Sequence, residues 1–199
     1  MQITNVNVVE RKGYFFMILE QQVFNVKGMN YSIRSAEEKD AGELSSLRVQ
    51  IDGETENMDR EQGEAYIDEA GFAGIIRVDA QKPRNLFLVA VVQGRIVGYA
   101  RCEGMDLKRS AHKVEFGVCV ARELWGYGIG KKLLEISIHW ADTAGVEKMT
   151  LNVLGTNDKA VELYKKVGFE VEGIMRRDRL HADGQFYDTI VMGRFRSQV

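Results

Sequence analysis

The sequence predicts a single α/β domain, and three observations support this fold class. The chain of 199 residues is long enough for one core and too short for several. Apolar residues make up 45% of the chain and charged residues 28%, which is the balance of a globular protein. From Tyr31 onward, segments with the two-residue period of strands alternate with segments of helical period, in the order β α α β β β α β α β β.

The first half of this order rests on hydrophobic spacing. The stretch "YSIRSA", which starts at Tyr31, alternates as a strand does, and "EEKDAGELSSLRVQI" places apolar residues at helical spacing from Ala41 to Ile51. Residues 56–80 predict a second helical region, which Gly63 and Gly71 interrupt. The stretches "NLFLVAVV" and "IVGYARCEG" on either side of Gly94 predict a hairpin of two strands.

The second half contains a further strand, two helices and a closing hairpin. The strand "HKVEFGVCV" places Glu115, Gly117 and Cys119 on the face opposite its valines and phenylalanine. After a glycine segment comes a helix that is apolar around most of its circumference, as a buried helix is. The strand "KMTLNVL", the amphipathic helix "NDKAVELYKKVGF" and two strands joined by the turn "HADG" complete the chain.

Residues 1–28 fit no single element, so we treat them as an N-terminal extension of unknown role to a domain of residues 29–199. The apolar stretch "YFFMIL" in this extension is far shorter than a membrane span, and no cleavage site of small residues follows it. Secretion and membrane insertion are therefore not expected. The stretch could instead bury itself against a second subunit, which would make the protein a homodimer.

Charge and cysteine content exclude several function classes. Lysine and arginine total 27 and aspartate and glutamate 29, so a net charge of −2 gives no overall attraction to nucleic acid or to an anionic membrane. Cys102 and Cys119 lie in different segments, and neither they nor the 3 histidines show metal-ligand spacing. We therefore expect no disulfide framework and no metal site, and a cytoplasmic location suits the free thiols.

Three glycines, Gly126, Gly128 and Gly130, stand between a strand and its following helix. Because they carry no side chains, their amide hydrogens can converge at the positive end of the helix dipole, where a phosphate group binds. The spacing GxGxG differs from the GxGxxG of dinucleotide-binding folds and from the GxxxxGK[ST] of nucleotide hydrolases. We expect a local phosphate site, and the alternative is that the glycines only permit a tight turn.

Two blocks of the sequence resemble the GNAT (GCN5-related N-acetyltransferase) family. The stretch "VCVARELWGYGIGKKLL" resembles the family's core motif, [Q/R]xxGxG/A between a strand and a helix, with Gly128 and Gly130 on its two small positions. Trp125 stands where the family usually has arginine or glutamine, so backbone amides would carry the phosphate grip. The stretch "NDKAVELYKKVGF" resembles the second block, and the resemblance extends roughly from Tyr31 to Phe195.

The resemblance implies the acyl-CoA N-acyltransferase fold, which has a mixed, mostly antiparallel central sheet, helices on both faces, and splayed fourth and fifth strands, here residues 112–120 and 148–154. Acetyl-CoA, the implied cosubstrate, would lie in the V-shaped gap, where one amide of the fourth strand polarises the thioester carbonyl. Asn157 could equally serve as a helix N-cap, and Lys131 as a solvated surface charge. The expected cofactor-binding residues are Val118, Cys119, Val120, Trp125, Gly126, Tyr127, Gly128, Ile129, Gly130, Lys131 and Asn157.

Acetyl transfer requires a neutral amine nucleophile and an acid for the leaving coenzyme A thiolate. Tyr164 is the expected acid, because its phenol is protonated at neutral pH and it matches a tyrosine that family members often use. The alternative is a core tyrosine. Glu115 is the expected base or base-side relay, with room beside it at Gly117, and the alternative is a salt bridge. Cys119 is not expected to carry acetyl, since no histidine lies near it in the sequence.

We therefore expect an N-acetyltransferase that moves acetyl from acetyl-CoA to a primary amine by direct attack in a ternary complex. The acceptor classes left open are polyamines, amino-acid-like compounds and protein N-terminal amines, and the acidic residues between Asp52 and Glu64 favour a cationic acceptor. The rival is a non-catalytic acyl-CoA-binding sensor or structural module. Release of free thiol with a panel of amines distinguishes the two.

Overall fold

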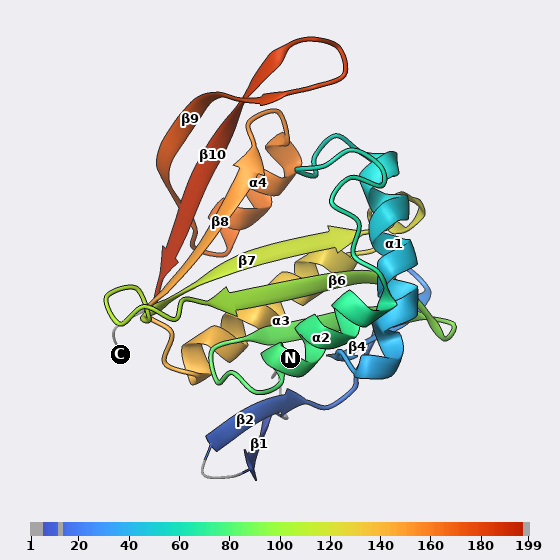
Figure 1. Cartoon of the computed structure of the whole chain (residues 1–199), viewed down its shortest axis with the longest axis vertical. Helices are drawn as coiled ribbons and strands as arrows, with labels where there is room; N and C mark the ends of the chain where they lie inside the picture. The colour runs from blue at the N-terminus through green and yellow to red at the C-terminus, as the bar shows by residue number, and fades with distance from the viewer. Residues whose placement is uncertain (1–5, 12–13, 197–199) are drawn as a thin grey trace.

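The computed structural model describes residues 6–11 and 14–196, and describes side chains from Leu19 onward. The described residues form four α-helices, and Figure 1 shows them around a large sheet. In chain order the strands and α-helices are β1 (Val6–Arg11), β2 (Tyr14–Leu19), β3 (Gln22–Val26), β4 (Met29–Ser35), α1 (Ala41–Glu54), α2 (Glu69–Asp79), β5 (Leu86–Val92), β6 (Arg95–Gly104), β7 (Lys113–Val120), α3 (Ile129–Thr143), β8 (Lys148–Leu154), α4 (Asp158–Lys166), β9 (Glu170–Leu180) and β10 (Phe186–Phe195). Two short 3-10 helices, η1 (Glu38–Asp40) and η2 (Arg122–Leu124), precede α1 and α3.

The main sheet has eight strands in the order β3-β4-β5-β6-β7-β8-β10-β9. The pair β7 and β8 is parallel, and the other neighbouring pairs are antiparallel. Strands β1 and β2 pair with each other in a separate two-stranded sheet. The element order expected from Tyr31 onward and the mixed, mostly antiparallel sheet are both confirmed.

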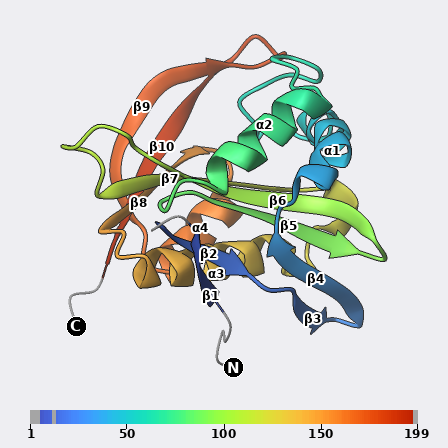
Figure 2. The ribbon, with the colours of Figure 1, turned by 60° about the horizontal axis from the view of Figure 1, so that its bottom comes forward.

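Helices cover both faces of this sheet, as Figure 2 shows, with α1 and α2 on one face and α3 and α4 on the other. Each face has its own hydrophobic core, and the larger one lies under α3. Leu133, Leu134, Ile136 and Trp140 of α3 are each 2% exposed or less. Full burial of one such side chain contributes about 2 kcal/mol to the free energy of unfolding. Apolar residues surround most of α3 because the helix is buried between the sheet and neighbouring segments.

Strands β7 and β8 separate soon after they start. Their register contains only three pairs, Lys113 with Lys148, Val114 with Met149 and Glu115 with Thr150. Beyond these pairs β8 continues alongside β10 as far as Leu154, while β7 stays paired with β6 on its other side. In Figure 1 the two strands diverge visibly from this point. The splayed pair is therefore confirmed, and it leaves the β8-facing backbone edge of β7 beyond Glu115 without a strand partner in the described part of the chain.

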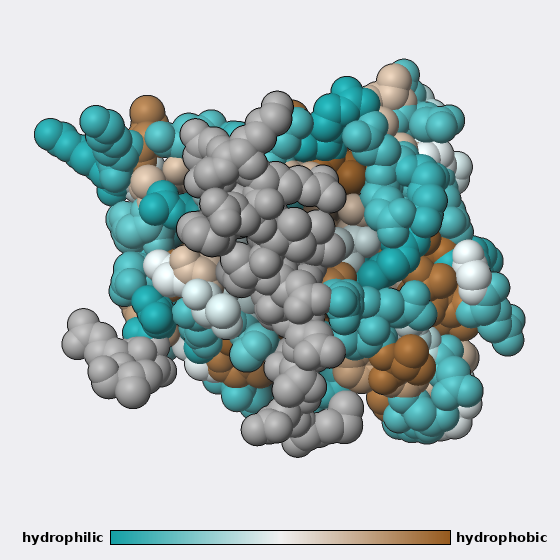
Figure 3. Space-filling model, turned by 90° about the horizontal axis from the view of Figure 1, so that it is seen from below, coloured by the Kyte–Doolittle hydropathy of each residue, from teal (hydrophilic) through white to brown (hydrophobic). Residues whose placement is uncertain are grey.

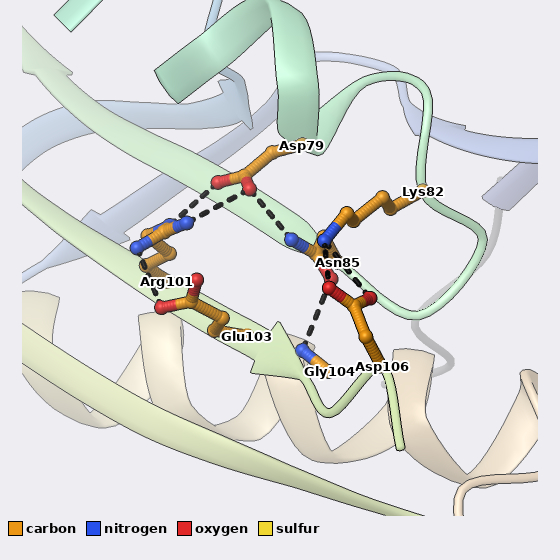
Figure 4. A network of polar contacts seen from close by, with 7 residues as sticks. All are labelled: Asp79, Lys82, Asn85, Arg101, Glu103, Gly104 and Asp106. Atoms are coloured by element: carbon orange, nitrogen blue, oxygen red, sulfur yellow. Dashed lines mark hydrogen bonds and ion pairs between the residues drawn. The ribbon is translucent and has the colours of Figure 1, made fainter. Parts of the chain in front are cut away.

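A buried ion pair fixes α2 and its following loop to the sheet (Figure 4). Asp79 at the end of α2 is 4% exposed and accepts hydrogen bonds from Arg101 Nε at 2.6 Å and Nη2 at 2.9 Å, and from Asn85 Nδ2 at 2.6 Å. The other amide atom of Asn85, Oδ1, accepts from the backbone N–H of Gly104 at 3.0 Å. This network holds α2 over β5 and β6. Because the segment that joins α1 to α2 leads into this helix, the network positions that segment as well.

Two sequence expectations differ from the structure. The second helical region begins only at Glu69, because Gly63 and Ala65 adopt left-handed backbone angles (φ +82° and +45°) that interrupt a helix. Residues 22–26, which we placed in the N-terminal extension, form β3 and pair with β4 across a tight turn at Lys27 and Gly28. Both turn residues have positive φ (+55° and +81°), as two-residue hairpins require.

Figure 3, which looks at the molecule from below, shows apolar residues as separate patches among hydrophilic ones over the part that is not grey. Within residues 6–11 and 14–196, no helix has both the length and the apolar character that crossing a membrane would take.

Candidate active site

The glycine segment forms a bare loop at the start of α3. Gly126 and Gly128 have φ values of +86° and +75°, which L-residues with a side chain rarely adopt. Gly128 is the N-cap of α3 and offers no side-chain cap, and the first helical hydrogen bond runs from Lys132 N–H to Gly128 C=O at 2.9 Å. The N–H groups from Gly126 to Lys131 donate to no acceptor in the described part of the chain. The loop therefore presents unsatisfied donors at the positive end of a helix.

The loop is held in place from two sides. The indole Nε1 of Trp125 donates to the carbonyl of Val120 at 2.7 Å and so fixes the loop to the end of β7. On the other side, the carboxylate of Glu54 at the end of α1 accepts from the backbone N–H of Arg122 at 2.7 Å. Trp125, which stands at the arginine or glutamine position of the motif, thus shapes the loop rather than adding charge to it.

The two lysines that follow the loop are largely neutralised by one acid. Lys131 and Lys132 both pair with Glu135 one turn later, at 3.6 Å and 2.6 Å. Their side chains are 56% and 32% exposed, so water also screens them. The amides rather than the lysines are the strongest anion-binding feature of this end of α3.

The final residues of β7 differ in exposure. Val118 and Val120 pack against the larger core, whereas Cys119 points to the other face, is 8% exposed and belongs to the core under α1 and α2. Burial raises the pKa of the Cys119 thiol to about 12, although a hydrogen bond with Tyr99 opposes this shift. A buried, protonated thiol is a poor nucleophile, so the geometry gives no support to an acetyl-cysteine intermediate.

Helix α4 carries Tyr164 and begins at Asn157. Tyr164 is 9% exposed and packs against Phe169 with ring centroids 5.8 Å apart. Burial raises the pKa of its phenol to about 12, so the hydroxyl keeps its proton at neutral pH. Asn157 acts as the N-cap, because its Oδ1 accepts from the N–H of Ala160 at 3.3 Å. Its amide nitrogen has no hydrogen bond to any described residue and remains available as a donor.

Glu115 lies at the point where the gap opens. It is exposed and forms the last pair of the β7–β8 register, opposite Thr150, with Glu103 opposite on β6. No ion pair involves Glu115 among the residues that the structure describes. The neighbouring Gly117 has no atom within 4 Å of a Cβ added to it, which leaves space on the same face of β7.

A cavity of about 1030 Å³ lies next to the loop. The end of α1, the segment that follows it and the tip of the β9–β10 hairpin surround it, and Trp125 stands at its rim. Seven carboxylates and three guanidinium groups line it, together with His181. The seven acids are Asp52, Glu54, Glu56, Asp59, Glu61, Glu64 and Asp178. The cavity is therefore acidic overall.

An ion pair and a hydrogen bond join the two walls of this cavity. Arg179 on β9 pairs with Asp59 at 2.5 Å, and His181 in the hairpin turn lies 3.0 Å from Glu56. A further ion pair, Asp52 with Arg60 at 3.1 Å, stays within one wall. The family resemblance implies an acceptor pocket between residues 51–70 and the closing hairpin, and residues 56–59 and 178–182 meet here although they are far apart in the sequence.

The family model described as "Acetyltransferase (GNAT) family" matches residues 44–169. The chain belongs to this family. The L-amino acid N-acetyltransferase AaaT of Escherichia coli (strain K12) is 31% identical over 116 residues, which are 58% of this chain and 71% of the relative. The spermidine N(1)-acetyltransferase of the same strain is 27% identical over 97 residues, 48% of this chain and 52% of the relative.

Solved structures of acetyltransferases share the fold. The acetyltransferase of the GNAT family from Streptococcus pneumoniae superimposes with a TM-score of 0.80 at 28% identity, covering 84% of this chain and 99% of the other. The putative acetyltransferase yncA from Salmonella typhimurium, solved with its cofactor acetyl-CoA, gives a TM-score of 0.75 at 21% identity, with 85% and 95% covered. This GNAT protein is accordingly an acyltransferase that N-acetylates an amine with acetyl-CoA.

The expected site residues of this acetyltransferase lie on both faces of the sheet, because Cys119 belongs to the core under α1 and α2 and Tyr164 to the larger core. The loop from Trp125 to Lys131 lies at the end of β7, and Val118, Val120 and Tyr164 share one core. Glu115 stands at the apex of the splayed strands rather than in the acidic cavity. The individual roles of these residues stay predictions.

Proposed function

We propose that this acetyltransferase acts on a cationic primary amine of the polyamine type, by direct attack on acetyl-CoA in a ternary complex. The acidic cavity beside the loop carries this proposal, since its seven carboxylates face only three guanidinium groups. Three acids are paired internally, which leaves an excess of negative charge for a ligand. Such a cavity concentrates cations and disfavours acidic acceptors.

Acetyl-CoA binding follows from the free backbone donors. In our proposal the N–H groups from Gly126 to Lys131 hold the diphosphate, and the backbone from Val118 to Val120 pairs with the pantetheine arm in the gap. The amide of Asn157 contacts the same arm. One amide of β7 aimed at the thioester oxygen contributes about 3 kcal/mol to transition-state stabilisation.

The proton steps need two groups. An alkylammonium with a pKa of about 10.4 is only about 0.04% neutral at pH 7, so a base must take its proton before or during attack. We assign this task to Glu115, which is exposed at the apex of the gap and can pass the proton to water. Tyr164 then donates its proton toward the leaving thiolate.

Three further properties belong to the same proposal. We place the protein in the cytoplasm, where its buried free thiols Cys102 and Cys119 stay reduced. The reaction needs no metal, and within the described residues no group of three or more potential ligands is gathered to hold one. A homodimer through "YFFMIL" remains an open proposal, because the side chains of residues 14–18 lie outside the described part.

The test is acceptor-dependent release of free thiol with spermidine, a neutral amino acid, an acidic amino acid and an N-terminal peptide amine. We expect the highest kcat/KM with spermidine and a KM that rises with ionic strength. The double variant Glu61→Gln, Asp178→Asn should raise the KM for spermidine by about 5-fold, at about 0.5 kcal/mol for each exposed charge. Glu162→Gln on α4, outside the cavity, should leave it unchanged.

Two outcomes would contradict this proposal in different ways. A higher kcat/KM with the neutral or acidic amino acid would refute the cationic acceptor and leave the acetyltransferase activity intact. Tight binding of acetyl-CoA without thiol release for any amine would favour the rival, a non-catalytic acyl-CoA-binding sensor or structural module.

A further inference from the structure

A buried hydroxyl without a partner lies under the phosphate loop. Tyr31 on β4 is 2% exposed, and its hydroxyl oxygen makes no hydrogen bond with any residue that the structure describes. Buried polar atoms are almost always paired, because an unpaired one loses its hydrogen bond to water without replacement. An unpaired atom in a well-packed core therefore calls for a partner that the described residues of the ligand-free chain do not supply.

The hydroxyl lies close to the N-cap of α3. A Cβ added to Gly128 would stand 4.0 Å from the Tyr31 hydroxyl and 3.7 Å from Val26 Cγ1, with nothing else among its three nearest heavy atoms within 4 Å. The β3–β4 hairpin thus forms the floor under the loop. Phe24 of the same hairpin supports Tyr31, with ring centroids 5.4 Å apart, and lies under the ammonium group of Lys132 at 5.8 Å.

The hydroxyl is a donor at every physiological pH. Burial raises the pKa of Tyr31 above its ordinary value, and the negative charge of Glu135 adds to the shift. The hydroxyl therefore stays protonated, and its O–H can donate a hydrogen bond to an acceptor close by. The nearby groups on α3 that carry charge, Lys132 and Glu135, already pair with each other at 2.6 Å.

We propose that Tyr31 is a positioning residue for the diphosphate of acetyl-CoA, and that its hydroxyl gains a hydrogen bond to the carbonyl of Gly126 or Tyr127 only when the loop closes on the diphosphate. The inference rests on the proposed position of the diphosphate at this loop. Gly126 and Gly128 have positive φ and no side chain, so their peptide planes can rotate at low cost. A rotation that turns an N–H outward to the diphosphate turns the preceding carbonyl inward, toward Tyr31.

The test compares wild type with Tyr31→Phe, which keeps the ring and removes only the oxygen. In the ligand-free state the variant loses an unpaired buried group, so its melting temperature should stay equal or rise by a few degrees. The dissociation constant for coenzyme A, measured by titration calorimetry, should rise about 3- to 10-fold, the range of one net hydrogen bond. A purely structural tyrosine would show the opposite, with lower stability and unchanged affinity.

A truncated donor separates the diphosphate from the rest of the cofactor. S-acetyl-pantetheine carries the thioester but no diphosphate, so Tyr31→Phe should leave its kcat/KM unchanged while raising the KM for acetyl-CoA. Thr189→Val is the matched control, because Thr189 on β10 is 1% exposed and its hydroxyl is also unpaired. Thr189→Val should change the melting temperature as Tyr31→Phe does, but it should leave the dissociation constant for coenzyme A unchanged.

Equal coenzyme A affinity of wild type and Tyr31→Phe would overturn the inference, and so would equal losses with both donors. Failure of the wild type itself to bind coenzyme A would instead refute the proposed position of the cofactor. The two failures are therefore distinguishable in one set of titrations.

Discussion

Replacing Gly128 by alanine tests whether the left-handed backbone at the N-cap of α3 is a requirement. The added Cβ would meet Val26 at 3.7 Å and the Tyr31 hydroxyl at 4.0 Å, which are ordinary contacts, so sterics contribute no penalty. The cost comes from φ at +75°, which disfavours a residue with a side chain by about 1–2 kcal/mol. We expect the ligand-free protein to lose that amount of unfolding free energy.

Gly130→Ala is the matched control two residues later. Gly130 lies within α3, its φ is not positive, and its Cβ would stand 3.7 Å from Val120 Cγ2. Alanine is a better helix former than glycine by about 0.5–1 kcal/mol, so this variant should be as stable as wild type or more so. The two variants should differ by about 2 kcal/mol, or about 4–8 °C in melting temperature.

Thermal unfolding followed by circular dichroism, with and without coenzyme A, measures both effects. We expect coenzyme A to stabilise wild type and Gly130→Ala by similar amounts, and Gly128→Ala by less, because the amides of the loop are displaced. If Gly128→Ala melted at the temperature of Gly130→Ala, the argument from backbone strain would be wrong.

Four further predictions concern catalysis and stability. Tyr164→Phe should lower turnover by roughly 10²-fold with little change in acetyl-CoA affinity, and an unaltered rate in steady-state assays would remove Tyr164 from the mechanism. Because the pKa of the Cys119 thiol is raised to about 12, native protein mixed with acetyl-CoA should show no acetyl-cysteine in intact-mass spectra, and Cys119→Ala should retain activity; an acetyl adduct lost in that variant would contradict direct transfer. Asp40 accepts from Arg34 at 2.6 Å and 2.8 Å, and although burial alone would raise the pKa of this carboxyl, Arg34 and the Glu37 N–H lower it below 3.8. The contribution of the Asp40 carboxylate to the free energy of unfolding is therefore complete above about pH 4 and is lost as the pH falls further. In urea unfolding, the difference in stability between wild type and Asp40→Asn should shrink below pH 4. A difference that stays constant with pH would refute the pairing. Asp79→Ala, which removes the buried acceptor of Arg101 Nε and Nη2 and of Asn85 Nδ2 (Figure 4), should cost about 3 kcal/mol. Glu103→Ala, which removes the exposed partner of the same arginine, should cost less than about 1 kcal/mol in the same assay.

The fold was predictable wherever the burial pattern is regular. Strand β7 and helix α4 alternate or repeat apolar residues with the period of their element, and Asn157 and Gly168 mark the two ends of α4. The first half of the second helical region was not predictable, because the left-handed angle at Ala65 gives no compositional signal. Strand β3 was missed because only Phe24 of its five residues is fully buried, so no alternation stands out.

The site divides in the same way. The bare backbone of the loop was predictable because three closely spaced glycines lead directly into a helix. The acidic cavity was only half predictable, since Asp52 to Glu64 is one continuous segment but Arg179 and His181 reach it through the fold. The unpaired hydroxyl of Tyr31 has no sequence signal, because it depends on which atoms surround it in the core.

The most direct measurement for the whole account is a crystal structure of the protein with coenzyme A and spermidine. We predict diphosphate oxygens within about 3.2 Å of the amides between Gly126 and Lys131, the pantetheine arm between β7 and β8, and a spermidine nitrogen in the acidic cavity directed at the sulfur. A diphosphate bound elsewhere on the chain, with these amides facing only water, would contradict the account.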